Sequence, residues 1–330
     1  MHRLPDCVIE PNPVPAMPEN LQFRECIPGA ARRVLIVVNA TAGRRGRASA
    51  IDELVDALAA VGLQTERLDS LDDLAVRSKE LMQSGALRAV VAAGGDGTAA
   101  EIVNRTAPET PVAVYPLGTE NLLAKYLEVG PDPAKFAQMV VQGHTTRLDA
   151  GRGNGRIFLL MAGIGFDAEV VRRLHEARNG NITHWTYVKP ILQSIRSYNY
   201  PELRVYCAPG ETESVPIRCR FAFVFNLPKY GFGLRFAPAA SGTDRELDLC
   251  TFERGGLISG LKYVFAVALG IHERLRGFTR WRGQQLRIES DDPVPYELDG
   301  DRGGVLPLTI EVVPQRLRLL VPSNWKPPVC

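Results

Sequence analysis

Hydrophobic and polar positions follow two different rhythms along this chain, and the change falls near Arg147. Before that point, short continuous apolar runs alternate with stretches in which apolar residues recur every three or four positions. Continuous runs are typical of strands that are covered on both faces of a sheet, and the wider spacing predicts helices. The predicted strands read "RVLIVVN", "LQTERLD", "LRAVVAAGG" and "PVAVYPLG".

Helices are predicted between these strands. One spans residues 51–58, another begins after Ser70 as its N-cap, a third follows Thr98, and a fourth begins within "ENLLAKYL". Strands and helices in alternation indicate an open parallel sheet with right-handed crossovers.

After Arg147 strand-like runs follow one another with turns between them: "ELRVYCA", "SVPIRCRFAFVFN", "ELDLCTF", "QQLRIES" and "PLTIEVV". Helix patterns survive only near residues 167–177, 185–197 and 256–275. We therefore predict an α/β-plus-β protein, in which a doubly wound parallel-sheet domain precedes an antiparallel β-sandwich. The predicted divisions are a proline-rich arm at 1–30, the α/β domain at 31–146, the β-rich domain at 147–321 and a tail at 322–330.

Composition excludes several classes of protein. The 330 residues carry a formal net charge of only +2, so nothing favours nucleic acid as a partner. The six cysteines form no C-x-x-C pair, which argues against zinc, and scattered reduced thiols suit the cytoplasm. The apolar stretch 256–271, "GLISGLKYVFAVALGI", is too short to span a bilayer and contains Lys262. We expect a buried helix there rather than one that contacts a membrane.

Three unusual loops follow predicted strands: "NATAGRRG" at 39–46, "GGDGT" at 94–98 and "PLGTEN" at 116–121. Ligands of open parallel sheets bind at the carboxyl ends of the strands. Glycines let the backbone approach a ligand closely, and the helix starts that follow offer free N–H groups to an anion. Hydroxyls and positive charge are added by Thr41, Thr98, Thr119, Arg44, Arg45 and Arg47. Each loop alone is compatible with an ordinary tight turn, but the three together favour a polyphosphate.

Asp96 stands out among the glycines because a carboxylate repels phosphates. It has a use there if it holds Mg²⁺, directly or through water, or accepts a proton from an attacking hydroxyl. Glu101, one turn further on, orients the loop or contacts a ribose in this reading. Neither a P-loop nor a dinucleotide-binding G-x-G-x-x-G motif is present.

These residues resemble the diacylglycerol kinase catalytic family, which includes sphingosine and ceramide kinases, over about residues 33–321. The G-G-D-G-T-x-x-E block is matched by residues 94–101, and Asn104 also fits. "NATAG" is similar to N-P-x-[SA]-G with alanine for proline, and "PLGTEN" to P-L-G-T-x-N-D with Leu122 for aspartate and Glu120 for a small residue. Further on, "FLLMAGIGFDAEVV", "FAPAASGTDRELDL" and "ELDGD" resemble the β domain of the family, and Asp301 stands where D-G-E has glutamate.

The resemblance implies an enzyme that transfers the γ-phosphoryl group of ATP to a lipid alcohol, with Mg²⁺ held by Asp96. Asp301, or else Asp96, would accept the hydroxyl proton. A structural cation would lie near Ser241, Asp244 and Glu246. The implied ATP-binding residues are Asn39, Thr41, Gly43, Gly94, Gly95, Gly97, Thr98, Glu101, Gly118, Thr119 and Asn121.

The same resemblance implies a cytoplasmic protein that meets the membrane surface through its β domain. Arg172, Arg173, Arg178 and Arg196 are candidates for contact with anionic headgroups, or else form a solvated face. The sequence leaves open whether the chain forms a homodimer. Two other readings also stay open. One is an NAD kinase-like enzyme. The other is a catalytically silent nucleotide- or lipid-binding module, which Glu120, Leu122 and Asp301 motivate.

Overall fold

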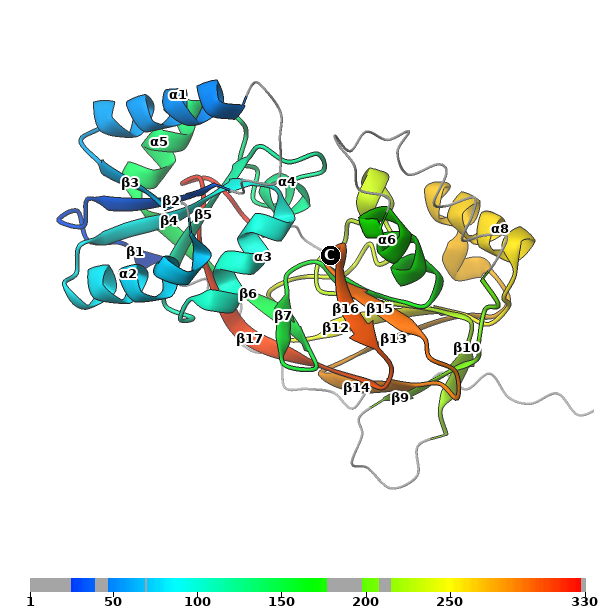
Figure 1. Ribbon diagram of the computed structural model, residues 1–330. Helices are drawn as coiled ribbons and strands as arrows, with labels where there is room; N and C mark the ends of the chain where they lie inside the picture. The colour runs from blue at the N-terminus through cyan, green and yellow to red at the C-terminus, as the bar shows by residue number, and fades with distance from the viewer. Residues whose placement is uncertain (1–24, 39–46, 69, 177–197, 208–214, 328–330) are drawn as a thin grey trace, which may run out of the picture.

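The computed structural model describes residues 25–38, 47–68, 70–176, 198–207 and 215–327, which form two domains side by side (Figure 1). In the first domain, four parallel strands stand in the order β5-β4-β2-β3. Helices α1 and α5 cover one face of this sheet, and α2 and α3 cover the other (Figure 1). The elements are β2 (Arg33–Val38), α1 (Arg47–Ala60), β3 (Gln64–Leu68), α2 (Leu71–Gln83), β4 (Leu87–Gly94), α3 (Asp96–Arg105), β5 (Pro111–Pro116), α4 (Leu122–Tyr126) and α5 (Pro133–Gln142). The predicted doubly wound fold is confirmed.

Local sequence signals account for several of these boundaries. The Ser70 hydroxyl accepts a hydrogen bond from the backbone N–H of Asp72 at 3.1 Å, which is the predicted cap of α2. At α5, the Asp132 carboxylate accepts from the N–H of Lys135, and Gly143 ends the helix with a left-handed φ of 69°. Strand β4 is buried along its whole length, as its unbroken apolar run predicts.

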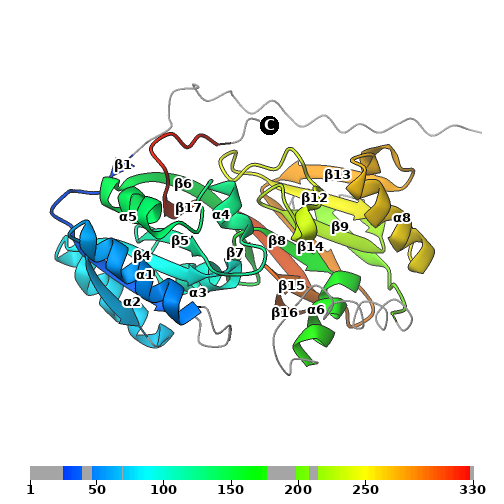
Figure 2. The same cartoon turned by 90° about the horizontal axis from the view of Figure 1, so that it is seen from above.

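The second domain is an antiparallel sandwich. One sheet has the order β13-β12-β11-β8-β15-β16. Its core alternates along β11, where Ala222 and Val224 face the opposite sheet while Phe221, Phe223 and Phe225 belong to the core on the other face. Helices α6 and α8 lie on that second face (Figures 1 and 2). The strands and helices are β8 (Met161–Ile164), α6 (Phe166–Glu176), β9 (Leu203–Cys207), β10 (Ile217–Cys219), β11 (Phe221–Phe225), β12 (Leu247–Phe252), α8 (Leu257–Ala268), β13 (Phe278–Gly283), β14 (Gln285–Glu289), β15 (Pro295–Leu298) and β16 (Asp301–Val305), with short 3₁₀ turns at η2 (Gly231–Gly233) and η3 (His272–Arg274).

One long strand joins the two domains. Strand β17 (Leu308–Leu320) pairs antiparallel with β14 and with β6 (His144–Gly153), and its end pairs parallel with β5. Two short strands, β1 (Glu25–Cys26) and β7 (Arg156–Phe158), also pair with β6. The second sheet of the sandwich is therefore continuous with the parallel sheet, and the last strand returns to the first domain.

Some details differ from the sequence-based expectations. The run "SVPIRCRFAFVFN" was expected to form one strand, but it divides into β10 and β11, which belong to different sheets. The helix predicted over 256–275 ends at Ala268, and the expectation that it is buried is wrong for one of its sides, where Ile258 is 83% exposed. The helix predicted at 185–197 lies outside the described residues.

Candidate active site at the domain junction

The GGDGT and PLGTEN loops meet at the carboxyl ends of the neighbouring strands β4 and β5. Their backbones touch, because a β-carbon placed on Gly118 would lie only 2.5 Å from the Cα of Gly95. The N–H of Leu117 also donates to the carbonyl of Gly94 at 2.9 Å. Glycine at 118 is thus required by the close approach of two backbones, and a β-carbon on Gly95 would be a tight contact at 3.3 Å from the Cα of Gly118.

Asn121 fixes the shape of the second loop. Its Oδ1 accepts from the N–H of Gly118 at 2.8 Å, and its Nδ2 donates to the carbonyl of Gly118 at 3.0 Å. Its own backbone is left-handed, with φ at 51°, a conformation that asparagine adopts more readily than most residues. Thr119, on the same loop, is exposed to solvent.

The Asp96 carboxylate binds the start of α4. Its Oδ2 accepts from the N–H of Leu122 and its Oδ1 from the N–H of Leu123, both at 2.9 Å. Helix α4 has no side-chain cap of its own, so Asp96 caps it from the neighbouring loop. Burial raises the pKa of this carboxyl while the two N–H donors oppose the rise. This capping role was not predicted, because its partners lie 26 and 27 residues away.

The other residues of the GGDGT block have packing roles as well. A β-carbon on Gly94 would overlap the Thr98 side chain, which is buried in the first turn of α3. Asn104 links α3 to the next domain, because its amide donates to the carbonyl of Ile157 at 2.9 Å and accepts from the N–H of Ile157 at 2.8 Å. The GGDGT block and the helix that follows it therefore form part of the domain junction.

The β15–β16 hairpin brings Asp301 to this junction. Asp299 and Gly300 form its turn with φ values of 54° and 83°, as a type I′ turn requires. A β-carbon on Gly97 would lie 3.9 Å from Oδ2 of Asp301. The predicted acidic residue of the second domain thus stands against the N-terminus of α3.

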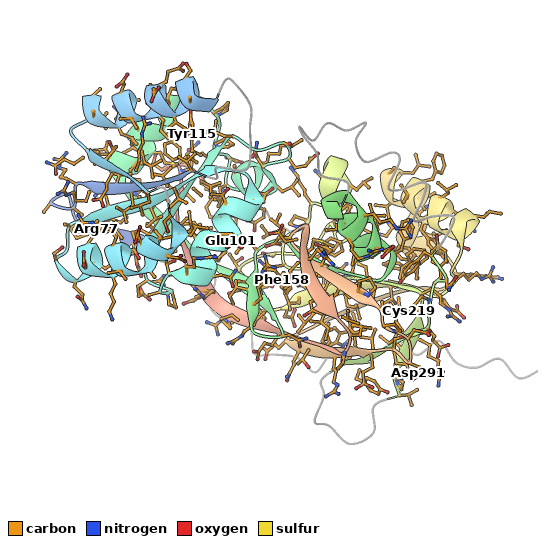
Figure 3. The ribbon with its side chains drawn as sticks, in the orientation of Figure 1. Arg77, Glu101, Tyr115, Phe158, Cys219 and Asp291 are labelled. Atoms are coloured by element: carbon orange, nitrogen blue, oxygen red, sulfur yellow. The ribbon has the colours of Figure 1, made fainter. Side chains whose placement is uncertain are left out.

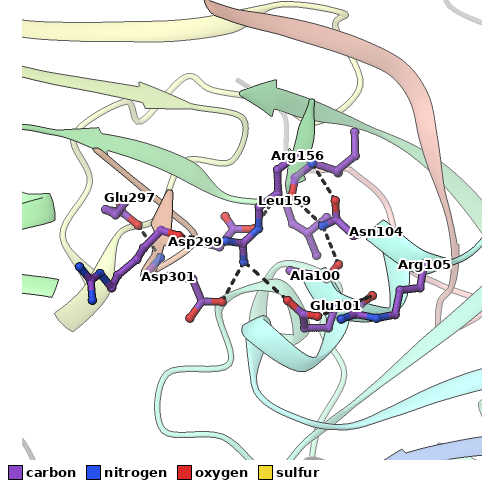
Figure 4. Close-up of polar contacts among 12 residues, drawn as sticks. Ala100, Glu101, Asn104, Arg105, Arg156, Leu159, Glu297, Asp299 and Asp301 are labelled. Carbon is purple, nitrogen blue, oxygen red and sulfur yellow. Dashed lines mark hydrogen bonds and ion pairs between the residues drawn. The ribbon is translucent and has the colours of Figure 1, made fainter. Parts of the chain in front are cut away.

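An arginine that the sequence reading did not single out, Arg156, joins the two sides (Figure 4). Its partner Glu101 on α3 is also labelled in Figure 3. Nη2 of Arg156 lies 3.2 Å from Oδ2 of Asp301 and 3.6 Å from Oε1 of Glu101. Glu101 also pairs with Arg105 on the same helix. The only signal for Arg156 is its place two residues before the "FLLMAG" stretch.

Two further acids support the hairpin. Asp299 accepts from three backbone N–H groups, those of Leu159 at 2.6 Å, Leu160 at 2.8 Å and Met161 at 3.1 Å. Burial raises the pKa of Asp299 to about 7, and the negative charge of Asp96 adds to the rise. Asp299 is thus an anchor of the turn that carries Asp301.

The second acid, Glu297, is 1% exposed and faces the Asp167 carboxylate across Gly163, where any β-carbon would overlap both groups. One oxygen of each acid has no donor in the described structure, and burial together with the charge of Asp167 raises the pKa of Glu297, which favours one proton held between the two carboxylates. The other oxygen of Glu297 accepts from the N–H of Gly300, and Asp167 accepts from the Tyr230 hydroxyl. This pair was not predicted.

The residues predicted to hold a structural cation lie on a loop whose acidic side chains already have an arginine as their partner. Asp244 accepts from the N–H of Glu246 at 3.1 Å and pairs with Arg282, which also lies 3.6 Å from Glu246. The Ser241 hydroxyl lies 3.0 Å from that of Thr243. Within the described ranges, no three His, Cys, Asp or Glu side chains form a metal-binding group. Cation binding here stays a prediction.

Some predicted residues cannot be placed. Asn39, Thr41 and Gly43 lie outside the described residues, as do Arg44, Arg45, Arg178 and Arg196. Arg172 and Arg173 both pair with Glu169, at 2.7 Å and 2.6 Å.

Comparison with known proteins identifies the class of the fold. Residues 33–152 match the diacylglycerol kinase catalytic domain, and residues 161–321 match the YegS C-terminal NAD kinase beta sandwich-like domain. The two matches together cover most of the chain, and it belongs to the diacylglycerol kinase catalytic-domain family.

Individual relatives match most of this chain at low sequence identity. The diacylglycerol kinase of Staphylococcus carnosus (strain TM300) is 23% identical over 301 residues, which are 89% of this chain and 97% of the relative. The diacylglycerol kinase of Bacillus subtilis (strain 168) is also 23% identical, over 300 residues, with the same shares covered. A crystal structure of a diacylglycerol kinase from Bacillus anthracis strain Sterne superposes with a TM-score of 0.62 at 18% identity and covers 88% of this chain and 97% of that one.

Proposed function

We propose that the protein transfers the γ-phosphoryl group of ATP to the hydroxyl of a lipid alcohol, with diacylglycerol as the first choice of acceptor. Family membership and the names of its relatives support a lipid kinase. The observation that carries the proposal is the position of Asp301 against Gly97, at the N-terminus of α3. An acid thereby stands beside the helix start at which an anionic phosphate group would be bound.

The nucleotide phosphates would lie on the strand ends of the first domain. Gly95 and Gly97 leave room for them, the first N–H groups of α3 face them, and Thr119 is an exposed hydroxyl donor. Asn39, Thr41 and Gly43 would close this site from the first loop, and Gly118 and Asn121 would keep the second loop in place. Phosphoryl transfer depends chiefly on such alignment and on the neutralisation of charge.

The residues at the junction are suited to Mg²⁺. Asp96 and Asp301 offer carboxylate oxygens, which are the ligands that this ion prefers. The negative charge of Asp96 already raises the pKa of Asp299, so the junction holds acidic charge that a divalent cation would relieve. When bound with ATP, Mg²⁺ supplies charge neutralisation. Asp96 would hold it, and Asp301 would stay available to accept the hydroxyl proton.

Asp301 is the better candidate for the group that accepts the hydroxyl proton. Asp96 already binds two backbone N–H groups, whereas the Asp301 side chain is 36% exposed to solvent at the junction. The guanidinium of Arg156 fixes the direction of the Asp301 carboxylate by its 3.2 Å contact. Glu101 holds the other side of that guanidinium in turn.

The test is transfer of label from γ-labelled ATP in the presence of Mg²⁺, with diacylglycerol in mixed micelles and NAD as separate acceptors. We expect a labelled lipid phosphate from the wild type and a loss of about 10²-fold in rate for Asp301→Ala. Asp301→Glu should restore much of that rate, since it keeps the carboxylate. The matched control is Asp291→Ala, which removes an exposed surface acid and should leave the rate unchanged.

Label that appears in NAD or inorganic phosphate and in no lipid would contradict the proposal. If the Asp301→Ala variant transfers the phosphoryl group at a rate within a few-fold of the wild-type rate, a residue other than Asp301 accepts the proton. The proposed setting for this reaction is the cytoplasmic surface of a membrane, where both ATP and the acceptor are found.

A further inference from the structure

Helix α8 is apolar on both of its sides. One side packs on the six-stranded sheet, where the Tyr263 ring stacks on Phe252 with centroids 4.3 Å apart and meets the edge of Phe221 at 5.7 Å. Ala266 and Val267 are buried on the same side. The opposite side, continued by the turn after the helix, carries large apolar side chains that are exposed to solvent: Ile258 83%, Leu261 57%, Val264 50%, Phe265 66%, Leu269 57% and Ile271 40%.

These exposed residues form a continuous ridge. Ile258, Leu261, Phe265 and Leu269 are spaced by three or four positions, so they stand one above another on one side of the helix. Single exposed apolar residues need no explanation, but a contiguous apolar patch on a surface marks a site of interaction. Elsewhere in the described structure, large exposed apolar side chains are scattered, such as Val76 and Val215. The ridge on α8 therefore requires an occupant.

The charges around the ridge indicate which occupant. Lys262 is exposed at its edge, Arg254 is exposed just before the helix, and Arg274 and Arg276 are exposed just after it. Of the acids nearby, Glu273 lies 3.5 Å from Arg280, and Glu253 packs against Gly277. An apolar helical surface bordered by Lys and Arg is the arrangement that binds the interface of an anionic bilayer.

The geometry points to a single function for this surface, and we infer that α8 docks the protein on anionic membranes by inserting the ridge below the headgroups. Among the helices that the structure describes, none is long and apolar enough to cross a membrane. The long stem of Lys262 lets its ammonium group reach the headgroups while its neighbours are immersed.

The place of α8 connects this surface to the candidate site. Phe166 of α6 contacts the Phe221 ring at 6.1 Å, and Tyr263 of α8 contacts the same ring, so both helices cover one face of the sheet that ends in β16 (Figures 1 and 2). That sheet also carries Asp301. The helix that carries the docking surface therefore packs on the same β-sheet whose last strand carries the proposed proton acceptor. This part of the inference rests on the proposed lipid kinase activity, whereas membrane binding itself does not.

The experiment is co-sedimentation of the full chain with vesicles of phosphatidylcholine, with and without phosphatidylglycerol. Wild type should bind the anionic vesicles and bind phosphatidylcholine alone much more weakly. The double variant Leu261→Gln/Phe265→Gln should bind the anionic vesicles at least about tenfold more weakly, because two large apolar side chains are no longer transferred from water into the bilayer. Lys262→Gln should weaken binding by a smaller factor and make it less sensitive to salt. The control is Val76→Gln, which changes an exposed apolar residue on α2 and should leave binding unchanged.

Two outcomes would overturn the inference: no binding of the wild type to anionic vesicles, or equal binding of the double variant. If the ridge instead pairs two copies, sedimentation velocity will show a dimer that the double variant dissociates, without vesicle binding by either protein. Thermal unfolding will establish that the double variant is folded.

Labelled phosphoryl transfer separates this inference from the proposed function. If docking is correct, the double variant keeps full activity on a short-chain diacylglycerol dispersed below its micelle concentration and loses activity on vesicles. If the wild type binds vesicles but phosphorylates neither the dispersed diacylglycerol nor the diacylglycerol in vesicles, the docking inference stands and the kinase proposal fails.

Discussion

Asp96 gives the most specific prediction, because the same carboxylate has a structural role and a proposed catalytic role. The structure assigns it to cap α4 through the N–H groups of Leu122 and Leu123, and the proposed function adds Mg²⁺ binding. Hydrogen bonds to a charged acceptor contribute about 1.5–3 kcal/mol each. Because α4 has no other side-chain cap, we expect Asp96→Ala to lower the free energy of unfolding by about 3 kcal/mol or more.

Asp96→Asn separates the two roles. The amide keeps one oxygen as acceptor but turns an NH₂ group toward the other backbone N–H, so we expect a loss of about 1–2 kcal/mol in stability. That leaves a domain of ordinary stability folded, and yet phosphoryl transfer should be abolished. Urea unfolding followed by circular dichroism measures the first quantity, and label transfer from ATP measures the second.

Asp132→Asn is a matched control for both measurements. Its carboxylate caps α5 in the same domain through the N–H of Lys135, so it should cost about 1 kcal/mol or less in stability and leave the rate unchanged. If Asp96→Asn proves as stable as the wild type, the cap is wrong. If its rate falls no further than that of Asp132→Asn, Asp96 has no role in transfer.

Three other changes test the account. Gly118→Ala should destabilise the protein by about 1–3 kcal/mol and lower ATP affinity, because the new β-carbon would lie 2.5 Å from the Cα of Gly95; unaltered melting and binding would refute the loop contact. Burial and the charge of Asp167 raise the pKa of Glu297 well above 4.5, so the folded state holds a proton that the unfolded state releases, and stability should fall as pH rises above that value. Glu297→Gln should flatten this decline and gain about 1–3 kcal/mol at alkaline pH in urea unfolding, whereas an unchanged pH profile would exclude the shared proton. Arg88→Met should cost about 3 kcal/mol in unfolding free energy, because the buried guanidinium donates to the carbonyls of Val140, Ile27 and Pro28; a loss below about 1 kcal/mol would show that these carbonyls find other donors.

The α/β domain was predictable because its signals are local. Unbroken apolar runs gave β2, β4 and β5, and Ser70 marked the start of α2. The glycine clusters indicated where two strand ends would meet, since adjacent parallel strands leave their loops at one edge of the sheet.

What could not be predicted depends on partners that are distant in sequence. The second pairing of β17 with β5 requires a register that no local pattern encodes. The cap by Asp96, the bridge by Arg156 and the acid pair of Asp167 and Glu297 each join segments from different parts of the chain. The exposure of α8 was missed because an apolar helix has the same composition whether protein or lipid covers it.

The central claim is that the strand ends of the first domain and the Asp301 hairpin of the second form one nucleotide site. Hydrogen–deuterium exchange with and without ATP and Mg²⁺ at millimolar concentration tests it most directly. The account predicts slower exchange in peptides that contain Gly95 to Thr98, Gly118 to Leu123 and Asp299 to Asp301, and no change in peptides from β9 and β10. No protection at these segments, or protection confined to other parts of the chain, would contradict it.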